Sequence, residues 1–185
     1  MQNWDASTFK PFFERLERRA EILKIVKPWG IGVELGVAEG HFSSELLGRE
    51  HLAHLYSIDM YAGDRGHDIE EYKKSLKLLM PFRDKNTIIK MKFDEAAPLF
   101  DDEYFDFIYV DGYAHTGEEG GHTFRDWFPK LKKGGVLSGH DYVQEYPLVI
   151  QAVDAFVLEN SLPLYLINDR SQGWNHGHPT WFTVK

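Results

Sequence analysis

Short apolar runs alternate with helical patterns along most of the chain, and this alternation limits the fold more than any other feature of the sequence. The alternation predicts an α/β fold in which a mostly parallel sheet carries helices on both faces. We expect strands at Ile31–Leu35, Leu55–Ile58, Ile88–Met91, Phe105–Val110, Val136–Ser138, Leu164–Ile167 and Trp181–Val184. We expect helices near His41–Arg49, Ile69–Met80, Glu95–Phe100, Glu118–Phe128 and Pro147–Asn160.

The segment before the first strand predicts an amphipathic helix over Ser7–Lys27 that ends at residues 28–30, a Pro-Trp-Gly sequence. Its aromatic face can cover the core or contact a second subunit, so the sequence leaves a homo-oligomer open. Two more signals mark helix boundaries. Thr116 and Glu119 have the spacing of a capping box, and Lys132–Gly135 places positive charge and then glycine where a helix stops.

Composition narrows the class of protein. A chain of 185 residues suits one domain, and 43% hydrophobic residues are too many for a disordered chain. The absence of cysteine excludes disulfides, thiolate nucleophiles and Cys-ligated zinc. No apolar run approaches the roughly 20 residues of a membrane span, and no signal segment is visible, so we expect a cytoplasmic protein without membrane contact. A net charge of −8 without a Lys/Arg cluster argues against nucleic acid and favours a small-molecule ligand.

A glycine-containing turn follows the first strand, at the carboxyl edge where parallel sheets bind ligands. In the sequence Glu34–Gly40, Gly36 and Gly40 allow the backbone to approach a ligand closely. Ala38 replaces the middle glycine of the dinucleotide motif, and the acidic Glu34 disfavours a pyrophosphate. The turn therefore favours a nucleoside without phosphates, although glycines that serve the geometry alone are the alternative.

Acidic residues also follow the second and third strands. Asp59, next to Met60, is placed to accept hydrogen bonds from both hydroxyls of a ribose, or else to act as a turn or cap residue. Asp94 either caps the short helix that follows it or accepts a hydrogen bond from an adenine amino group.

The fourth and fifth strands each end near an aspartate and a histidine: Asp111 with His115, and His140 with Asp141. Two carboxylates at adjacent strand ends suit a hard divalent cation such as magnesium, whereas histidine favours manganese, iron or zinc. The alternative is that Asp111 caps a loop and the histidines are ordinary polar residues. A later loop holds a further pair, His176 and His178, which we interpret as incidental.

Several of these motifs together resemble those of the class I S-adenosylmethionine-dependent methyltransferases. The resemblance covers roughly Gly32 to Phe156 and rests on residues 33–40, Asp59 and residues 105–112. Residues 107–112, His115 and residues 130–142 resemble more narrowly the macrocin-type and catechol-type small-molecule O-methyltransferases. Tyr142 and His115 depart from the catechol type, which has Asn or Asp and Lys there.

The resemblance implies a doubly wound, Rossmann-like fold with seven strands, of which the last is antiparallel. It implies a single methyltransferase domain over 1–185, with an amino-terminal helix (1–28), a cofactor-binding core (31–142) and a carboxy-terminal helix and strand pair (143–185). It also implies that residues 34–40 contact the methionine part of the cofactor, that Asp59 contacts the ribose, and that Asp111 and Asp141 hold the metal.

The resulting hypothesis is methyl transfer from S-adenosylmethionine to a hydroxyl of a small molecule, assisted by magnesium or another divalent metal. Asp111 and Asp141 are the predicted metal ligands, Asp111 also acts in catalysis, and His115 or His140 accepts the proton. The predicted cofactor-binding residues are Glu34, Gly36, Gly40, Asp59, Met60, Asp94 and Asp111.

Two other functions stay open. A nucleoside-binding or regulatory module would keep the fold without catalysis. A metal-assisted hydrolase would use Asp111, His115, His140 and Asp141 and would ignore S-adenosylmethionine. The missing middle glycine disfavours a nicotinamide enzyme.

Overall fold

A computed structural model describes residue 13 and residues 16–63, 66–112, 117–168 and 178–185. Its strands are β1 (Gly30–Leu35), β2 (Leu52–Asp59), β3 (Asn86–Lys90), β4 (Phe105–Val110), β5 (Leu131–Gly139), β6 (Tyr165–Ile167) and β7 (Thr180–Val184). Its α-helices are α2 (His41–Gly48), α3 (Ile69–Leu79), α4 (Phe93–Ala96), α5 (His122–Trp127) and α6 (Pro147–Glu159). Short 3₁₀ segments are η2 (Arg19–Ile25), η3 (Met80–Phe82), η4 (Ala97–Leu99) and η6 (Phe128–Lys130). None of the helices within these residues is long and apolar enough to cross a membrane.

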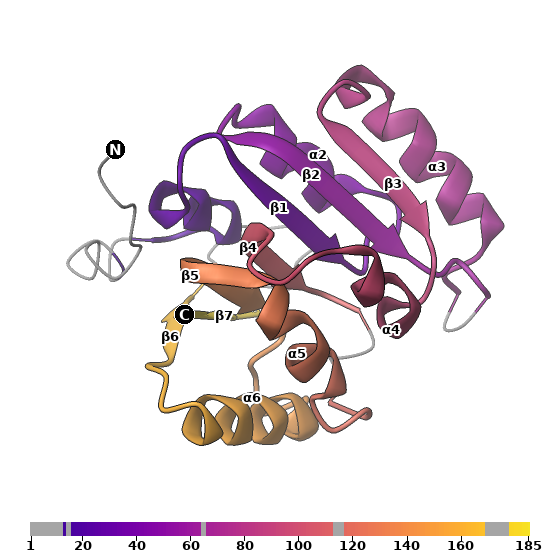
Figure 1. Cartoon of the computed structure of the whole chain (residues 1–185). Coiled ribbons are helices and arrows are strands. Elements are labelled where there is room, and N and C mark those ends of the chain that lie inside the picture. The colour runs from indigo at the N-terminus through magenta and orange to yellow at the C-terminus, as the bar shows by residue number, and fades with distance from the viewer. Residues whose placement is uncertain (1–12, 14–15, 64–65, 113–116, 169–177) are drawn as a thin grey trace.

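The seven strands form one sheet in the order β3-β2-β1-β4-β5-β7-β6 (Figure 1). Neighbours from β3 to β5 pair in parallel, whereas β7 pairs antiparallel with both β5 and β6. The predicted doubly wound, mostly parallel seven-stranded sheet with an antiparallel last strand is therefore confirmed. All six residues of the central strand β4 are buried, as expected for a strand covered on both faces.

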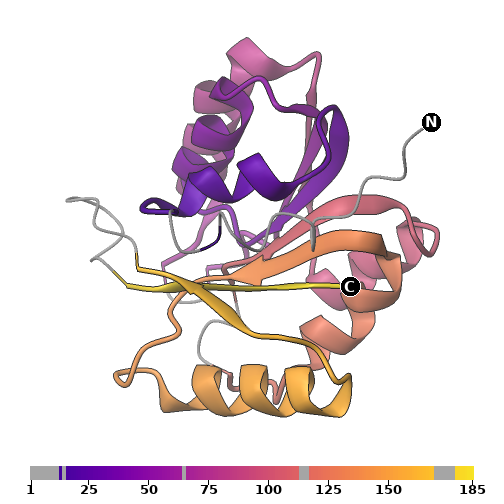
Figure 2. The same ribbon diagram turned by 90° about the vertical axis from the view of Figure 1, so that its left-hand side faces the viewer.

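Helices cover both faces of the sheet, and each face has its own apolar core. Side chains of η2 and α2 pack on one face against Phe107 and Tyr109 of β4. Side chains of α4, α5 and α6 pack on the other face against Ile108 and Val110. Figure 2 shows η2 and α2 on one side of the sheet and α6 on the other. The two faces use alternate residues of β4 because successive side chains of a strand point in opposite directions.

The prediction of one helix over Ser7–Lys27 is wrong where the structure describes the segment. Residues 1–12 and 14–15 lie outside the described residues, but Arg18 is extended at φ −132° and ψ 143°, and only η2 follows. The Glu21 side chain accepts hydrogen bonds from the backbone N–H groups of Glu17 and Arg18, 2.8 and 3.2 Å away. This local contact fixes a new helical start at the point where the periodic pattern predicts continuity.

The predicted boundaries around α5 also need correction. The helix predicted from Glu118 begins at His122, and the Glu119 carboxylate accepts a hydrogen bond from the N–H of Thr123 at 2.7 Å. Thr116, the other half of the predicted capping box, lies outside the described residues. Lys132–Gly135, predicted as a helix stop, belongs to β5, because η6 has already ended the helical stretch at Lys130.

The strand predicted at Val136–Ser138 is thus the later part of β5. Lys132 contributes to its early start by pairing with Asp106 of β4, with 2.7 Å between the charged atoms. The helix predicted at Glu95–Phe100 begins earlier, at Phe93, and consists of α4 followed by η4. Phe105–Val110 matches its prediction in full, and the remaining elements differ by a few residues at their ends.

The carboxyl ends of β1 and β4 approach each other closely. The N–H of Asp111 donates to the carbonyl of Leu35 at 2.7 Å, so the backbone after β4 lies beside the first residue after β1. That residue, Gly36, has φ +98°, and a Cβ there would lie 1.9 Å from the Asp111 carbonyl oxygen. Only glycine allows this contact, and with it the turn that leads to α2.

We predict that Gly36→Ala destabilises the protein by several kcal/mol or prevents folding, because its Cβ meets backbone atoms that cannot move aside. Gly63→Ala is the matched control: its φ is +87°, but a Cβ there meets nothing within 4 Å. This control should lose only about 1–2 kcal/mol through backbone strain. Urea unfolding of both variants measures the difference, and equal losses would contradict the steric argument.

Candidate active site

Four of the predicted acids lie at the carboxyl ends of the parallel strands. Glu34 is the penultimate residue of β1, Asp59 ends β2, Asp111 follows β4, and Asp141 lies two residues after β5. The parallel pairing of β2, β1, β4 and β5 places these ends at one edge of the sheet. The structure thus brings the four acids to one edge, while their chemical roles stay predictions.

The turn 36–40 is held in place by Asp59. Its Oδ2 atom accepts hydrogen bonds from the N–H groups of Val37 and Ala38, at 2.9 and 3.0 Å. Its Oδ1 atom accepts one from the N–H of Tyr61 at 3.2 Å. The side chain therefore orients the turn that begins α2, and a ribose would use the further acceptor capacity of the same two oxygens.

Glu34 lies beneath this turn in a buried polar network. The hydroxyl of Ser43 donates to the Glu34 carboxylate and lies 2.8 Å from the hydroxyl of Ser57. The side-chain amide of Asn86 donates to Ser57 Oγ at 2.8 Å, and all four residues are buried. Burial raises the pKa of Glu34 to about 8, although the hydrogen bond from Ser43 opposes the shift. The network stabilises an acid that the low dielectric would otherwise penalise strongly.

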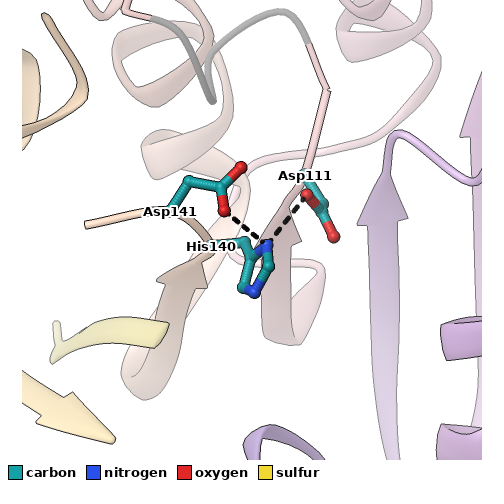
Figure 3. Close-up of side chains that lie close together, drawn as sticks. All are labelled: Asp111, His140 and Asp141. Carbon is teal, nitrogen blue, oxygen red and sulfur yellow. Dashed lines mark ion pairs between the residues drawn. The ribbon is translucent and has the colours of Figure 1, made fainter. Parts of the chain in front are cut away.

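Asp111, His140 and Asp141 form a second cluster, which Figure 3 shows. His140 Nδ1 lies 2.9 Å from Asp141 Oδ1 and 3.7 Å from Asp111 Oδ1. Burial lowers the pKa of His140, but the two carboxylates outweigh this effect and the net shift is upward. Asp141 has φ +61°, a strained backbone conformation for a residue with a side chain, which is often associated with functional sites.

This cluster fits a divalent cation. One ligand atom from each of Asp111, His140 and Asp141 lies within 4.8 Å of the others. Two carboxylate oxygens and an imidazole nitrogen suit manganese, iron or zinc better than an all-oxygen site would. His140 Nε2 is buried without a hydrogen-bond partner among the described residues, so Nδ1 is the nitrogen that faces the two carboxylates.

Two residues that the sequence analysis did not assign to the site lie against this cluster. Arg19 of η2 places Nη1 3.2 Å from Asp111 Oδ2, and His178 places Nδ1 2.7 Å from Asp141 Oδ1. Arg19 could have been noticed in the sequence. It lies three residues after Leu16 and three before Ile22, so a charged residue interrupts an otherwise apolar helical face. Nothing in the sequence marked His178 apart from its pairing with His176, because the loop that holds it has no periodic pattern.

A cavity of about 490 Å³ opens between the strand ends and α5. Met60, Phe93 and Asp94 line it on the side of β2 and α4, and Thr123 and Asp126 line it on the side of α5. Met60 and Phe93 are its apolar lining residues and the rest of the lining is polar, a mixture that suits a flat, amino-bearing ring such as adenine. Met60 and Asp94, both predicted to bind cofactor, therefore line the same cavity, and Asp94 also accepts a hydrogen bond from Glu95 N–H at 3.0 Å.

Two histidines from the sequence analysis are not among the described residues. His115, the predicted proton acceptor, lies outside the described residues, as does His176. Gly40 starts α2 with φ +87°, as the predicted turn requires.

Comparison with known proteins supports the same core. The sequence model of a family described as a methyltransferase domain matches residues 33–142, more than half of the chain. A search of curated proteins finds no matching sequence.

Solved structures with the same fold include three enzymes of different chemistry. Precorrin-6y C5,15-methyltransferase from Geobacter metallireducens GS-15 has 11% identity and TM-score 0.66, over 90% of this chain and 85% of that one. Spermidine synthase from Thermotoga maritima has 17% identity and TM-score 0.66, and the matching part covers 94% of this chain but only 58% of the synthase. An O-methyltransferase from Bacillus cereus, solved in complex with SAH, has 13% identity and TM-score 0.62, over 90% and 78% of the two chains. At these identities the likeness establishes the fold.

We predict that Glu34→Gln stabilises the protein at pH 9 by up to a few kcal/mol and changes it little at pH 5. The folded protein keeps a proton on Glu34 that the unfolded chain releases between pH 4.5 and about 8, so wild-type stability falls over this range. The amide cannot ionise and can still accept the hydrogen bond from Ser43.

Urea unfolding of wild type and variant at both pH values measures this effect. Glu145→Gln, at an exposed position, is the control and should give the same small difference at pH 5 and pH 9. A Glu34→Gln difference that does not change with pH would contradict the buried, protonated state.

Proposed function

The chain belongs to the methyltransferase domain family, and from this premise we propose that it transfers a methyl group from S-adenosylmethionine to a hydroxyl of a small molecule. The observation that carries the proposal is the convergence of Glu34, Asp59 and Asp111 around the turn 36–40. A ligand that carries an ammonium and a sulfonium would favour the ionised form of these acids, including Glu34, and its ribose hydroxyls would find acceptors beside the turn.

Several residues of and around the turn support binding of such a cofactor. Gly36 and Gly40 both have positive φ, and a side chain at either position would be strained. Asp59 is proposed to bind the ribose, and Met60 and Asp94 line the cavity proposed for adenine. The sulfonium already activates its methyl group, so the protein mainly has to align the acceptor with it. Alignment of that kind contributes roughly 7–11 kcal/mol to lowering a barrier.

Asp111, His140 and Asp141 are proposed to hold a divalent cation. A cation in this position would lower the pKa of the acceptor hydroxyl and fix its direction. The structural support is the donor set itself: two carboxylates and an imidazole lie together, in a site where Arg19 balances part of the negative charge. His178 contacts Asp141 as an outer partner, the usual way in which proteins orient a ligating carboxylate.

The proton of the acceptor hydroxyl needs a base close to the cluster. His115 is proposed for this role on its position in the sequence, four residues after Asp111. His140 is the less suitable candidate, because its Nε2 is buried and its Nδ1 faces Asp111 and Asp141. General-base assistance is worth about 10²–10⁴ in rate, so loss of the base should leave measurable activity.

We predict that Asp111→Asn lowers the rate of methyl transfer about 10²-fold or more, since it removes a ligand charge and the partner of Arg19 together. Chelation should slow the wild type strongly and the variant little. Asp102→Asn removes an exposed carboxylate paired with Lys130, away from the site, and is the charge-matched control. Transfer of a labelled methyl group to a panel of sugars, phenols and polyketides measures the rate.

Thermal shift with S-adenosylhomocysteine, NAD and divalent metals separates this function from its rivals, because a ligand that binds the folded state raises its melting temperature. We expect stabilisation by S-adenosylhomocysteine and not by NAD. Stabilisation by metal alone would favour the hydrolase, and cofactor binding without turnover would favour a binding module. An Asp111→Asn variant as fast as wild type would rule out the metal-assisted mechanism.

A further inference from the structure

Arg19 enters the candidate site from outside the strand ends that form the rest of it. It is the first residue of η2, and its side chain is only 10% exposed. Its neighbours Ala20, Ile22 and Leu23 are buried in the core on this face of the sheet, which anchors the segment. The guanidinium therefore has a fixed position, unlike that of a surface arginine.

Aromatic rings form the floor under this guanidinium. The Arg19 Cζ atom lies 4.0 Å from the centroid of the Phe42 ring, and Phe42 packs against Tyr109 with 4.4 Å between the ring centroids. Phe42 is the second residue of α2, which begins directly after the turn 36–40. The cation thus lies beside the amino terminus of α2, next to the turn proposed to bind the cofactor.

The ionisable groups that act on Arg19 lie on β1, on β4 and directly after β4. Nη1 pairs with Asp111 after β4, and Glu34 of β1 and Tyr109 of β4 also act on its charge. A buried cation is consequently paired with Asp111 and interacts electrostatically with Glu34, an acid that is protonated without a ligand. A ligand that carries a carboxylate and an ammonium on one carbon matches this pattern, because each of its charges then meets an opposite charge.

Resting on the function proposed above, we infer that Arg19 binds the α-carboxylate of the cofactor's amino-acid end, while Glu34 and Asp111 receive its ammonium. A guanidinium presents five N–H donors in a planar fork, and this fork matches carboxylate geometry. Arg19 would make the site specific for the complete amino-acid end over ligands that lack the carboxylate.

The experiment compares two ligands that differ only in this group, S-adenosylhomocysteine and its decarboxylated analogue. We expect wild type to bind the complete ligand about 10²-fold more tightly in calorimetry, the range for a hydrogen bond between charged groups. Arg19→Met keeps an unbranched side chain over Phe42 and should weaken only the complete ligand, so that the preference falls to a few-fold. Arg19→Lys keeps the charge without the fork and should fall between the two.

The analogue also reports on the integrity of the site. A role of Arg19 limited to orienting Asp111 would weaken both ligands by the same factor and leave their ratio unchanged, which would overturn the inference. Lys24→Met removes an exposed charge from the same segment and should change neither affinity.

Two further results separate this inference from the proposed function. A wild-type preference near one overturns the role of Arg19 even where Arg19→Met fails to fold. Absence of any binding of S-adenosylhomocysteine to wild type refutes the proposed cofactor itself, whatever Arg19 does.

Discussion

The backbone contact between the ends of β1 and β4 determines the geometry of the whole site. The hydrogen bond from Asp111 N–H to the Leu35 carbonyl joins the two strands one residue beyond the sheet, and Gly36 is what allows it. The chain then turns sharply toward α2, while Asp111 is left at the rim beside Glu34. A side chain at position 36 would separate these strand ends, and with them the turn, the buried acid and the carboxylate cluster.

Collecting acids at one edge creates an electrostatic problem, because desolvated carboxylates repel one another and lose their hydration. Each of the four acids has a different set of stabilising partners. Hydroxyls and a shifted pKa accommodate Glu34, and backbone N–H groups satisfy Asp59. Asp111 has an arginine, and Asp141 has contacts with two histidines. Each partner lowers the energy of its acid and still leaves oxygen lone pairs for a ligand.

The sequence predicts the sheet and the strand-end acids because both depend on local patterns. Apolar runs mark the strands, and the parallel arrangement brings Asp59 and Asp111 to one edge without knowledge of any contact. The partners of these acids could not be predicted in the same way. Arg18 and Arg19 are equivalent neighbours in sequence, and only the extended backbone at Arg18 turns Arg19 inward. Lys132 likewise resembles a helix stop until its pairing with Asp106 places it in β5.

The family match begins at residue 33, whereas Arg19 comes from the segment before it. The strand ends therefore supply acids, and a segment outside the matched core supplies the buried cation that pairs with Asp111. Removing that cation would leave Asp111 without its arginine partner, so that a metal or an ammonium would both be attracted to the same carboxylate. A fixed arginine favours one kind of ligand. A cationic ligand binds best beside it when the same ligand also carries an anionic group that can pair with the guanidinium. With the role inferred for Arg19, the segment that precedes the core would determine which charged ligands the site accepts.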